Sequence, residues 1–440
     1  MKLKFQNIVY LISFLLLTYN LSLAQEVKKL TLNESIKIGL KNSEEINSAK
    51  WRVTSADARL SEMNASRLPS LSLNANYTRL SPITPYTITT PFGDFELNQN
   101  IVNTYGVKLT LQQPIFTGFR LKANSDIAEY NLESVKEDFN RDKNDLVYNI
   151  KKAYWSLFKA NEVKKVVDEN VEQTKAHLKD VQNFYDQGLA TKNELLKVQV
   201  QLADTKLKQI DANNAVRLAV IGLNNVIGLP LSTKIDIADT VNPNKSVNEN
   251  LDVLVNKAYD KRPELKSMEF KIKASESGIT MAEAGWWPQI YLTGDYNYAR
   301  PNTRIFPTED KFKGTWDVNV TASFNLWNWG ATSDQTTQAE ATFEQAKDSY
   351  KTLKDNVTLE VTNNYLEMLR SKESISVAND NVKQAEENYR VTDQQFKNGL
   401  TLNSELLDAE VALLQAKTNY VQSLVDYELA VAQLEKSVGK

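Results

Sequence analysis

The sequence predicts a mainly α-helical protein with a small transmembrane β-barrel portion, built from a helix–hairpin–long helix–helix unit that occurs twice. Three observations predict this architecture: a repeat at a constant offset, two long stretches without glycine or proline, and four short segments in which apolar and polar residues alternate. A repeat constrains the architecture more than any single motif does, since every element of the unit must occur twice.

The two halves of the chain match without a gap at an offset of 211 positions from Pro114 onward. Upstream, Pro69 matches Pro288 at an offset of 219, so a single difference in length separates the copies. We therefore predict a first structural repeat over residues 25–228, a turn-rich linker over 229–250 that packs around the middle of the helices, and a second repeat over 251–440. Identical pairs at the main offset include Tyr154 and Tyr365, Asn170 and Asn381, Gly188 and Gly399, Leu195 and Leu406, and Gly228 and Gly439.

Composition excludes several classes of function. A formal charge of −3 excludes a strongly basic nucleic-acid-binding protein. The absence of cysteine removes disulfides, thiolate metal sites and a cysteine nucleophile. The only histidine, His177, lies among polar residues of a predicted helix, and we expect it to be an exposed surface residue. Neither a phosphate-binding loop nor a nucleophile–base pair is found, so the sequence predicts no enzyme, no catalytic residue, no metal site and no cofactor.

The first 24 residues have the pattern of an export signal. Lys2 and Lys4 precede an apolar run over residues 8–17, and Ser22-Leu23-Ala24 offers a small-x-small cleavage site. We predict a signal peptide over residues 1–24; an uncleaved membrane anchor is the alternative. No later segment approaches the 18 consecutive apolar residues typical of a transmembrane helix.

Two stretches predict unusually long helices. Residues 119–187 and 331–398 contain neither glycine nor proline, and their apolar residues recur at spacings of three and four, as in an amphipathic helix. At 1.5 Å per residue each helix would be roughly 100 Å long. Shorter helices, each roughly 50 Å long, can flank each long helix end to end. They are predicted over 192–227 and 403–438, which return from the long helices, and over about 34–67 and 251–286, which precede the strands.

Two β-hairpins are predicted, over residues 70–116 and 289–325. Their strands alternate apolar and polar residues over about ten positions, the pattern of a barrel wall between lipid and water. Aromatic residues at the strand ends suggest the girdle that such walls carry at the membrane interfaces. A soluble sheet packed on the helices would show the same alternation and is the alternative. The predicted girdle consists of Tyr77, Tyr105, Phe116, Tyr298, Trp316 and Trp327.

Four strands in one chain cannot close a barrel, and an open edge in lipid leaves backbone groups unpaired. The chain is therefore expected to form oligomers that complete the wall. Two copies would supply eight strands, whose interior fills with side chains, whereas three would supply twelve and enclose an open bore. Geometry favours the trimer over the dimer without deciding between them.

The pattern resembles the TolC family of outer-membrane efflux and secretion channels over the whole mature chain. The resemblance implies a trimeric channel-tunnel: a twelve-stranded barrel in the outer membrane of a Gram-negative bacterium, continued by a periplasmic helical barrel. It also implies a periplasmic adaptor and an inner-membrane pump as partners, and no nucleic acid. It rests on the strand entries Leu68-Pro69 and Trp287-Pro288, the strand exits 113–118 and 325–330, and the turns 185–189 and 396–400, each followed by Glu-Leu-Leu.

The resemblance also implies roles for the turns at the helix tips. In the family, acidic residues six and nine positions after the second turn glycine ring the periplasmic aperture; in this sequence they are Glu405 and Asp408. The first repeat has Glu194 at the first of these places but Lys197 at the second, and Thr401 stands where the family has a gate arginine. A solvated helix face is the alternative for these carboxylates. The expected adaptor-docking residues are Tyr185, Gly188, Leu189, Phe396, Gly399 and Leu400.

Together these features predict a trimeric outer-membrane channel-tunnel. It would provide the passive exit duct of a tripartite efflux or type I secretion system, with transport energy supplied by its partners. The alternative is a periplasmic coiled-coil scaffold or adaptor module with a soluble β-sheet, which would be extracted without detergent.

Overall fold

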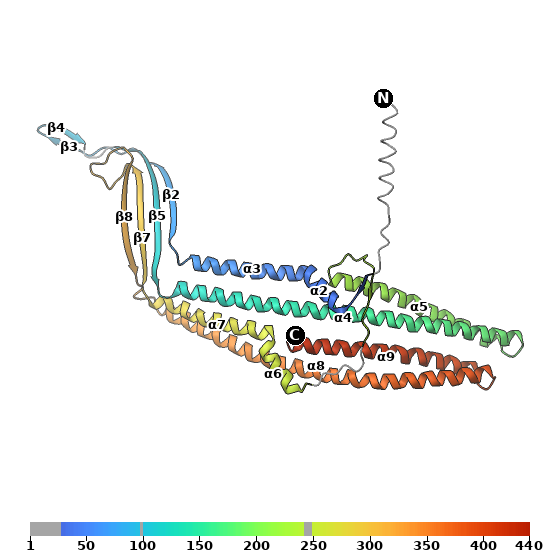
Figure 1. Cartoon of the computed structure of the whole chain (residues 1–440). Coiled ribbons are helices and arrows are strands. Elements are labelled where there is room, and N and C mark those ends of the chain that lie inside the picture. The colour runs from blue at the N-terminus through green and yellow to red at the C-terminus, as the bar shows by residue number, and fades with distance from the viewer. Residues whose placement is uncertain (1–27, 97–99, 242–248) are drawn as a thin grey trace, which may run out of the picture. The chain divides into compact units, whose positions relative to one another are not determined.

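The computed structural model describes residues 28–96, 100–241 and 249–440, so the predicted signal peptide lies outside the described residues. The chain divides into two compact units (Figure 1). The first, which we call the helical unit, contains the described residues up to Ala49, Asn140–Arg262 and Asp355–Lys440. The second, the sheet unit, contains Lys50–Phe139 and Pro263–Lys354. Three of the helices pass from one unit into the other.

The sheet unit is built around a four-stranded antiparallel sheet. Its strands are β2 (Ser70–Arg79), β5 (Asn103–Thr117), β7 (Gln289–Arg300) and β8 (Lys313–Ser323), and they pair in the order β2-β5-β7-β8. The strands of the two repeats therefore join through β5 and β7, and β2 and β8 form the two edges. The second hairpin was expected to reach residue 325, whereas β8 ends at Ser323.

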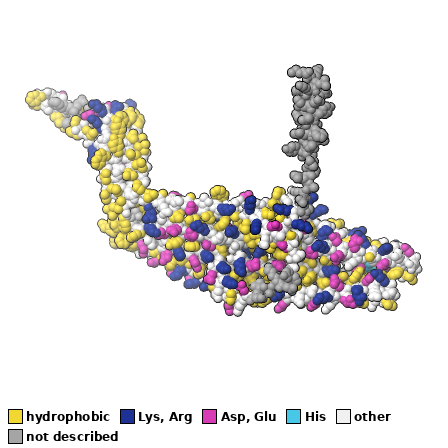
Figure 2. Space-filling view, viewed as in Figure 1, with side chains coloured by type: hydrophobic (Ala, Val, Ile, Leu, Met, Phe, Trp, Pro, Cys, Tyr) yellow, Lys and Arg dark blue, Asp and Glu magenta, His cyan; other side chains and the backbone are white. Residues whose placement is uncertain are grey.

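The register places apolar residues together on one face of this sheet. Leu73 of β2 pairs with Leu109 of β5, which pairs with Tyr296 of β7, which pairs with Trp316 of β8. Leu73 and Trp316 are 67 % and 69 % exposed, so the described residues of the chain do not cover this apolar face. Apolar side chains accordingly cover the strands in the space-filling view (Figure 2).

The opposite face of the sheet is polar. Asp295 of β7 accepts a hydrogen bond from Thr110 of β5 at 2.6 Å and lies 3.1 Å from the ammonium of Lys108. Strand β5 continues through Pro114, where the pairing with β7 shifts by one residue. Proline has no N–H to offer the ladder, so a bulge at this point is expected.

A second, two-stranded hairpin in the sheet unit was not predicted. It consists of β3 (Thr87–Thr90) and β4 (Gly93–Glu96), and lies within the connection between β2 and β5. The turn contains Gly93 at φ 120°, a conformation that residues with a Cβ rarely adopt.

The helices that precede the strands are each broken, contrary to the expectation of continuous helices over 34–67 and 251–286. The first consists of α2 (Leu32–Asn42) and α3 (Glu44–Ala65), and the second of α6 (Leu251–Lys261), α7 (Pro263–Glu283) and the short 3-10 helix η1 (Ala284–Trp286). Both breaks fall at one extended residue, Ser43 with ψ 123° and Arg262 with ψ 122°. Arg262 precedes a proline, which disfavours the helical conformation of the residue before it.

The long helices are continuous over 67 residues each. They are α4 (Arg120–Asp186) and α8 (Ala331–Lys397), against the predicted ranges 119–187 and 331–398. Each is followed, after a turn, by a helix of 35 residues, α5 (Lys192–Val226) or α9 (Asn403–Ser437). Within the described part of the chain, no helix combines the length and the apolar character needed to cross a membrane.

A small parallel sheet lies in the helical unit beside α4. It pairs β1 (Lys28–Leu30) with β6 (Ile235–Ile237), so the linker over 229–250, predicted to be turn-rich, contains a strand; residues 242–248 of that linker lie outside the described residues. The buried hydroxyl of Tyr154 lies 3.0 Å from the carbonyl oxygen of Leu30 and 2.9 Å from Oδ2 of Asp239. Burial raises the pKa of Tyr154, so the hydroxyl stays protonated and available as a donor.

Replacing Tyr154 with Phe should destabilise the protein by about 1–2 kcal/mol, because the buried carbonyl oxygen of Leu30 and the partly buried carboxylate of Asp239 lose a hydroxyl partner. The matched control is Tyr365→Phe at the corresponding position of the second repeat, where the side chain is only half-buried. Thermal unfolding of the detergent-solubilised protein, followed by circular dichroism, measures the difference. Equal melting temperatures for the two variants would show that the Tyr154 contacts contribute nothing.

Candidate functional site: the paired helix turns

The candidate site is formed by two turns of the helical unit, which we call the first turn (residues 185–191, between α4 and α5) and the second turn (residues 396–402, between α8 and α9). Gly188 and Gly399 have φ values of 78° and 70°, which are the positive values expected for tight turns. In each turn the residue after the glycine donates its N–H to a carbonyl five residues back, at 2.7 Å from Leu189 to Phe184 and 2.9 Å from Leu400 to Gln395. The two turns thus end α4 and α8 in the same way.

A shared apolar core joins the two turns. Phe396, one of the expected docking residues, is only 8 % exposed and belongs to this core. By contrast, Leu189 and Leu400 are 74 % and 76 % exposed, and Tyr185 is 37 % exposed. The structure therefore presents Tyr185, Leu189 and Leu400 at the surface and uses Phe396 for packing. The buried members of the core are Val181, Leu195, Val198, Phe396 and Leu406.

The helices that follow the two turns begin differently. Thr191 caps α5: its hydroxyl accepts from the N–H of Glu194 at 3.2 Å, and the Glu194 carboxylate accepts from the N–H of Thr191 at 2.6 Å. These hydrogen bonds lower the pKa of Glu194, so the cap is complete at neutral pH and is lost as pH falls through the lowered value. At the start of α9 the capping position is Leu402, which makes no side-chain cap. Glu194 is therefore held by its own helix, and Glu405 is not.

Glu405 and Asp408 lie on the exposed surface of α9, three residues apart, as the sequence predicted for one face of a helix. The opposite face of α9 is buried: Asn403 and Leu406 are 4 % and 1 % exposed, and Glu410 is fully buried. The structure thus separates an acidic surface from a buried face within the first two turns of α9.

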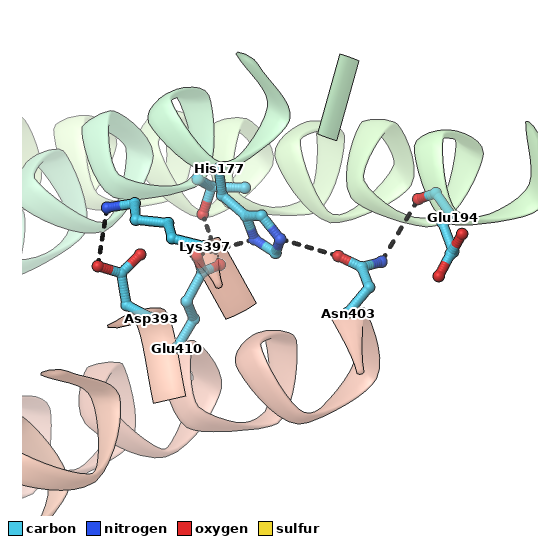
Figure 3. Close-up of polar contacts among 7 residues, drawn as sticks. His177, Glu194, Asp393, Lys397, Asn403 and Glu410 are labelled. Atoms are coloured by element: carbon cyan, nitrogen blue, oxygen red, sulfur yellow. Dashed lines mark hydrogen bonds and ion pairs between the residues drawn. The ribbon is translucent and has the colours of Figure 1, made fainter. Parts of the chain in front are cut away.

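A buried polar network connects this buried face of α9 to α4 (Figure 3). Nδ1 of His177 lies 3.1 Å from Oε1 of Glu410, and Nε2 lies 2.8 Å from Oδ1 of Asn403. Asn403 also donates from Nδ2 to the carbonyl oxygen of Glu194 in α5 at 3.5 Å, and Thr174 donates to the Glu410 carboxylate at 3.3 Å. The network therefore links three helices, α4, α5 and α9.

The expectation that His177 is an exposed surface residue was wrong: it is 4 % exposed. Lysines at 175 and 179 suggested a polar helix face, but His177 belongs to the other face. The buried residues Asn170, Thr174, His177 and Val181 are spaced by four, three and four, the spacing of a coiled-coil seam. This spacing was the signal in the sequence that could have located the network.

Residues of α8 enclose the network on a further side. The ring of Phe396 meets the His177 ring edge-on, with centroids 5.2 Å apart. Burial and the nearby Glu410 carboxylate raise the pKa of Tyr389 to about 12, so its hydroxyl is neutral at physiological pH. Lys397 is paired with Asp393 at 2.8 Å (Figure 3). Among the described residues, no cluster of side chains is suited to hold a metal ion.

The predicted aromatic girdle lies in two groups at opposite ends of the strands in the sheet unit. Tyr77 and Tyr105 have ring centroids 5.0 Å apart, and Tyr298 stacks on Phe312 at 5.1 Å. At the other end Phe116 meets Phe119 at 5.5 Å. Trp316 belongs to the first end and Trp327 to the second, where it contacts Trp329. Phe312, Phe119 and Trp329, which lie in the connections between elements, were not among the predicted girdle residues, although Trp327 of a connection was.

The two aromatic groups are separated by a distance that suits a membrane. Tyr105 and Phe116 are about eleven residues apart along β5, which corresponds to roughly 36 Å of strand. For strands tilted by about 45° the height is roughly 26 Å, close to the apolar band of a transmembrane barrel.

These features define a class: a subunit of a membrane-embedded channel, whose chain combines duplicated helical hairpins with a partial β-wall. The chain belongs to the outer membrane efflux protein family, whose model matches residues 36–229 and 254–440.

Individual relatives agree with this assignment. The chain is 22 % identical over 322 residues to outer membrane protein TolC of Vibrio cholerae, covering 71 % of this chain and 72 % of that protein. It is 23 % identical over 393 residues to the alkaline protease secretion protein AprF of Pseudomonas aeruginosa, covering 85 % and 77 %. The crystal structure of CusC superposes with a TM-score of 0.81 at 18 % identity, covering 95 % of each chain. The chain therefore has the channel-tunnel fold.

As a member of this family, the chain is an outer-membrane protein that provides an exit duct for an efflux or type I secretion system. Proteins of the family are homotrimeric channels that work with a periplasmic adaptor and an inner-membrane pump. The family is thus one of outer-membrane efflux channels.

Substituting valine for Gly188 or Gly399 should reduce efflux while trimers still insert. A Cβ at either position meets no atom within 4 Å, so the effect comes from the positive φ alone, at a cost of about 1–2 kcal/mol. Gly→Asn at the same positions is the matched control, because asparagine tolerates positive φ. Drug accumulation and adaptor crosslinking in cells measure the outcome. Unchanged efflux and crosslinking in both valine variants would contradict a role for the turns in docking.

Proposed function

We propose that three copies of this chain form the duct through contacts between α5 of one copy and α8 of the next. The observation that carries this proposal is an asymmetry between the repeats. Within one chain, α4 and α9 pack together and bury many of their apolar residues, whereas α5 and α8 leave several of the corresponding residues exposed. A further copy would cover these exposed faces.

The asymmetry between the repeats is visible in the exposed fractions of side chains at positions that the repeat offset relates. Trp155 of α4 is 5 % exposed, and its counterpart Leu366 of α8 is 56 % exposed. Val421 of α9 is 7 % exposed, whereas its counterpart Ile210 of α5 is 63 % exposed. Monomeric proteins seldom leave such a series of large apolar side chains in water.

The exposed residues of α5 follow the spacing of a coiled coil. Val200, Leu207 and Ile221 are 62 %, 60 % and 41 % exposed and lie seven or fourteen residues apart. This heptad spacing is typical of a seam that packs on a second helix. A copy of α8 fits the seam because the duplication relates it to α4, the helix on which α9 already packs.

Charges at matched positions support the same partner. Lys417 of α9 lies 3.2 Å from the carboxylate of Glu169 in α4. The corresponding residues are Lys206 of α5 and Asp380 of α8, which keep the same pair of opposite charges. The edge strands β2 and β8 are each hydrogen-bonded on one side only among the described strands, so the same rotation would also pair the sheets into twelve strands.

Glu405 and Asp408 are proposed to ring the periplasmic mouth, the narrow end of the duct formed by the paired turns. Their exposed position on α9 and the absence of a cap that would use Glu405 support this role. Three copies would gather six carboxylates, and Glu194 would contribute less because its own helix holds it. Converging charges of one sign raise the local concentration of cations.

The first and second turns are proposed to dock the periplasmic adaptor. Tyr185, Leu189 and Leu400 are the exposed apolar side chains there, and a cavity of about 410 Å³ opens between the turns. The two aromatic groups of the sheet unit are proposed to sit at the membrane interfaces. The duct itself is proposed to be passive and without enzymatic activity, with transport energy supplied by the partners.

The double variant Leu207→Glu with Ile210→Glu, on α5, should form no trimers. Two carboxylates would be buried in each seam between copies, at a cost of several kcal/mol. The control is Lys208→Glu, which adds the same side chain at an exposed position beside the seam. Light scattering of the detergent-solubilised protein measures its mass, which should be three times that of the mature chain for the unaltered protein and the control. A trimer of unchanged thermal stability for the double variant would contradict the α5–α8 interface.

Replacing Glu405 with Gln and Asp408 with Asn should reduce the preference of the channel for cations. Block by multivalent cations added from the periplasmic side should also weaken. Trimer stability should change little, by about 0–1 kcal/mol, because exposed carboxylates contribute little to folding. Single-channel recordings in planar bilayers test this, and wild-type selectivity with wild-type block in the double variant would place these carboxylates away from the mouth.

A further inference from the structure

We propose that His177 is a positioning residue of the periplasmic mouth: with Glu410 it forms a proton-dependent latch that holds the second turn against the first. This inference rests on the proposed position of Glu405 and Asp408 at the mouth. The latch closes when His177 carries a proton on both ring nitrogens and opens when one proton is lost.

The latch lies where it can set the position of the carboxylates. Asn403 precedes Glu405 by two residues, and Glu410 follows Asp408 by two, so the two contacts of His177 bracket the acidic segment. Because Asn403 and Glu410 lie on either side of this segment, holding both against α4 also limits the depth and rotation of Glu405 and Asp408.

The hydrogen-bonding partners of His177 require two protons. Both ring nitrogens face oxygen atoms, the carboxylate Oε1 of Glu410 at 3.1 Å and the amide Oδ1 of Asn403 at 2.8 Å. With the Glu410 carboxyl ionised, these oxygens satisfy a ring nitrogen only if it bears hydrogen, and only the imidazolium bears hydrogen on both. The orientation of the Asn403 amide is set by its other contact, the donation from Nδ2 to the carbonyl oxygen of Glu194.

Loss of one proton disrupts the network in either orientation of that amide. If Asn403 keeps its orientation, the lone pair of the neutral imidazole faces Oδ1. If the amide rotates to donate to the ring, Oδ1 faces the carbonyl oxygen of Glu194, and the link to α5 is lost. Both arrangements place two acceptors against each other in a buried site, where the lost hydrogen bond has no water to replace it.

The other charged groups around the latch do not substitute for it. On α8, Lys397 is engaged by Asp393 at 2.8 Å, and Tyr389 is neutral at physiological pH because its pKa is raised to about 12. On α4, Asp180 lies near enough to act on both Tyr389 and Lys397. On α5, Glu194 offers the latch its backbone carbonyl, while its carboxylate caps the helix.

The latch is specific to one of the two seams. At the repeat offset, His177 corresponds to Asn388, Glu410 to Gln199, and Asn403 to Lys192. In the proposed trimer, the seam between copies would therefore bring Asn388 and Gln199 together, a pair that does not change charge. A single buried polar pair of this kind is best known for fixing register in coiled coils, and in this chain one member can also lose a proton.

Hydrogen exchange of the trimer tests the latch directly. When the pH is raised from about 5 to about 8, exchange of the amides of residues 403–410 should become roughly tenfold faster after correction for intrinsic rates, as expected for losing one hydrogen bond to a charged group. The variant His177→Gln, which removes the imidazole, should exchange at one corrected rate across this range. Lys175→Gln, which removes an exposed cation from the same stretch of α4, should behave as wild type.

Conductance connects the latch to the mouth. Single-channel conductance of the wild type should rise across the same pH range, and that of His177→Gln should not change.

Wild-type exchange that does not depend on pH would overturn the latch, even if Glu405→Gln with Asp408→Asn alters selectivity and so upholds the gate. Exchange that depends on pH without any change in conductance would overturn the positioning role. If the double carboxylate variant keeps wild-type selectivity while exchange still depends on pH, the gate fails and the latch remains a clamp on the turns.

Discussion

The two edges of the four-stranded sheet, which no other described strand pairs, constrain the rest of this structure. Strands β2 and β8 each offer a row of backbone N–H and C=O groups that lipid cannot satisfy. Only strands of further copies, arranged around an axis, can pair both rows at once. The helices must be arranged around the same axis, because α4 is the next helix after β5 in the chain and α8 is the next helix after β8. The exposed seams of α5 and α8 are thus the helical consequence of a requirement set in the membrane.

Duplication allows one helical unit to serve two kinds of contact. The α4–α9 seam lies within a chain and is formed whenever the chain folds, whereas the α5–α8 seam depends on assembly. The two seams differ in their residues: Trp155 and Leu366 occupy matched positions, but the larger side chain lies in the seam that is buried within the chain. The only histidine also lies in the seam within the chain. In a trimer, each kind of side chain in these seams therefore occurs three times around the axis rather than six.

The fold class was accessible from the sequence because its signals are local. An uninterrupted run of helix-forming residues predicts α4 and α8, and strict alternation predicts which residues share the face of Leu73 and Leu109. The breaks at Ser43 and Arg262 were missed, although Pro263 is a breaker, because periodicity continues across them. The His177 network was missed for a different reason. Burial of a polar residue depends on which partner it meets, and Glu410 is 233 residues away in the chain.

The unequal caps at the starts of α5 and α9 have a consequence for local stability. A complete cap such as that of Thr191 and Glu194 typically stabilises the end of a helix by about 1 kcal/mol, and α9 begins at Leu402 without one. The first residues of α9 therefore unwind more readily than those of α5, and the tertiary contacts of Asn403 and Leu406 supply most of their order. Fraying of a few residues at this point would displace Glu405 and Asp408 without separating whole helices from their neighbours, so a small local motion is enough to move these two charges.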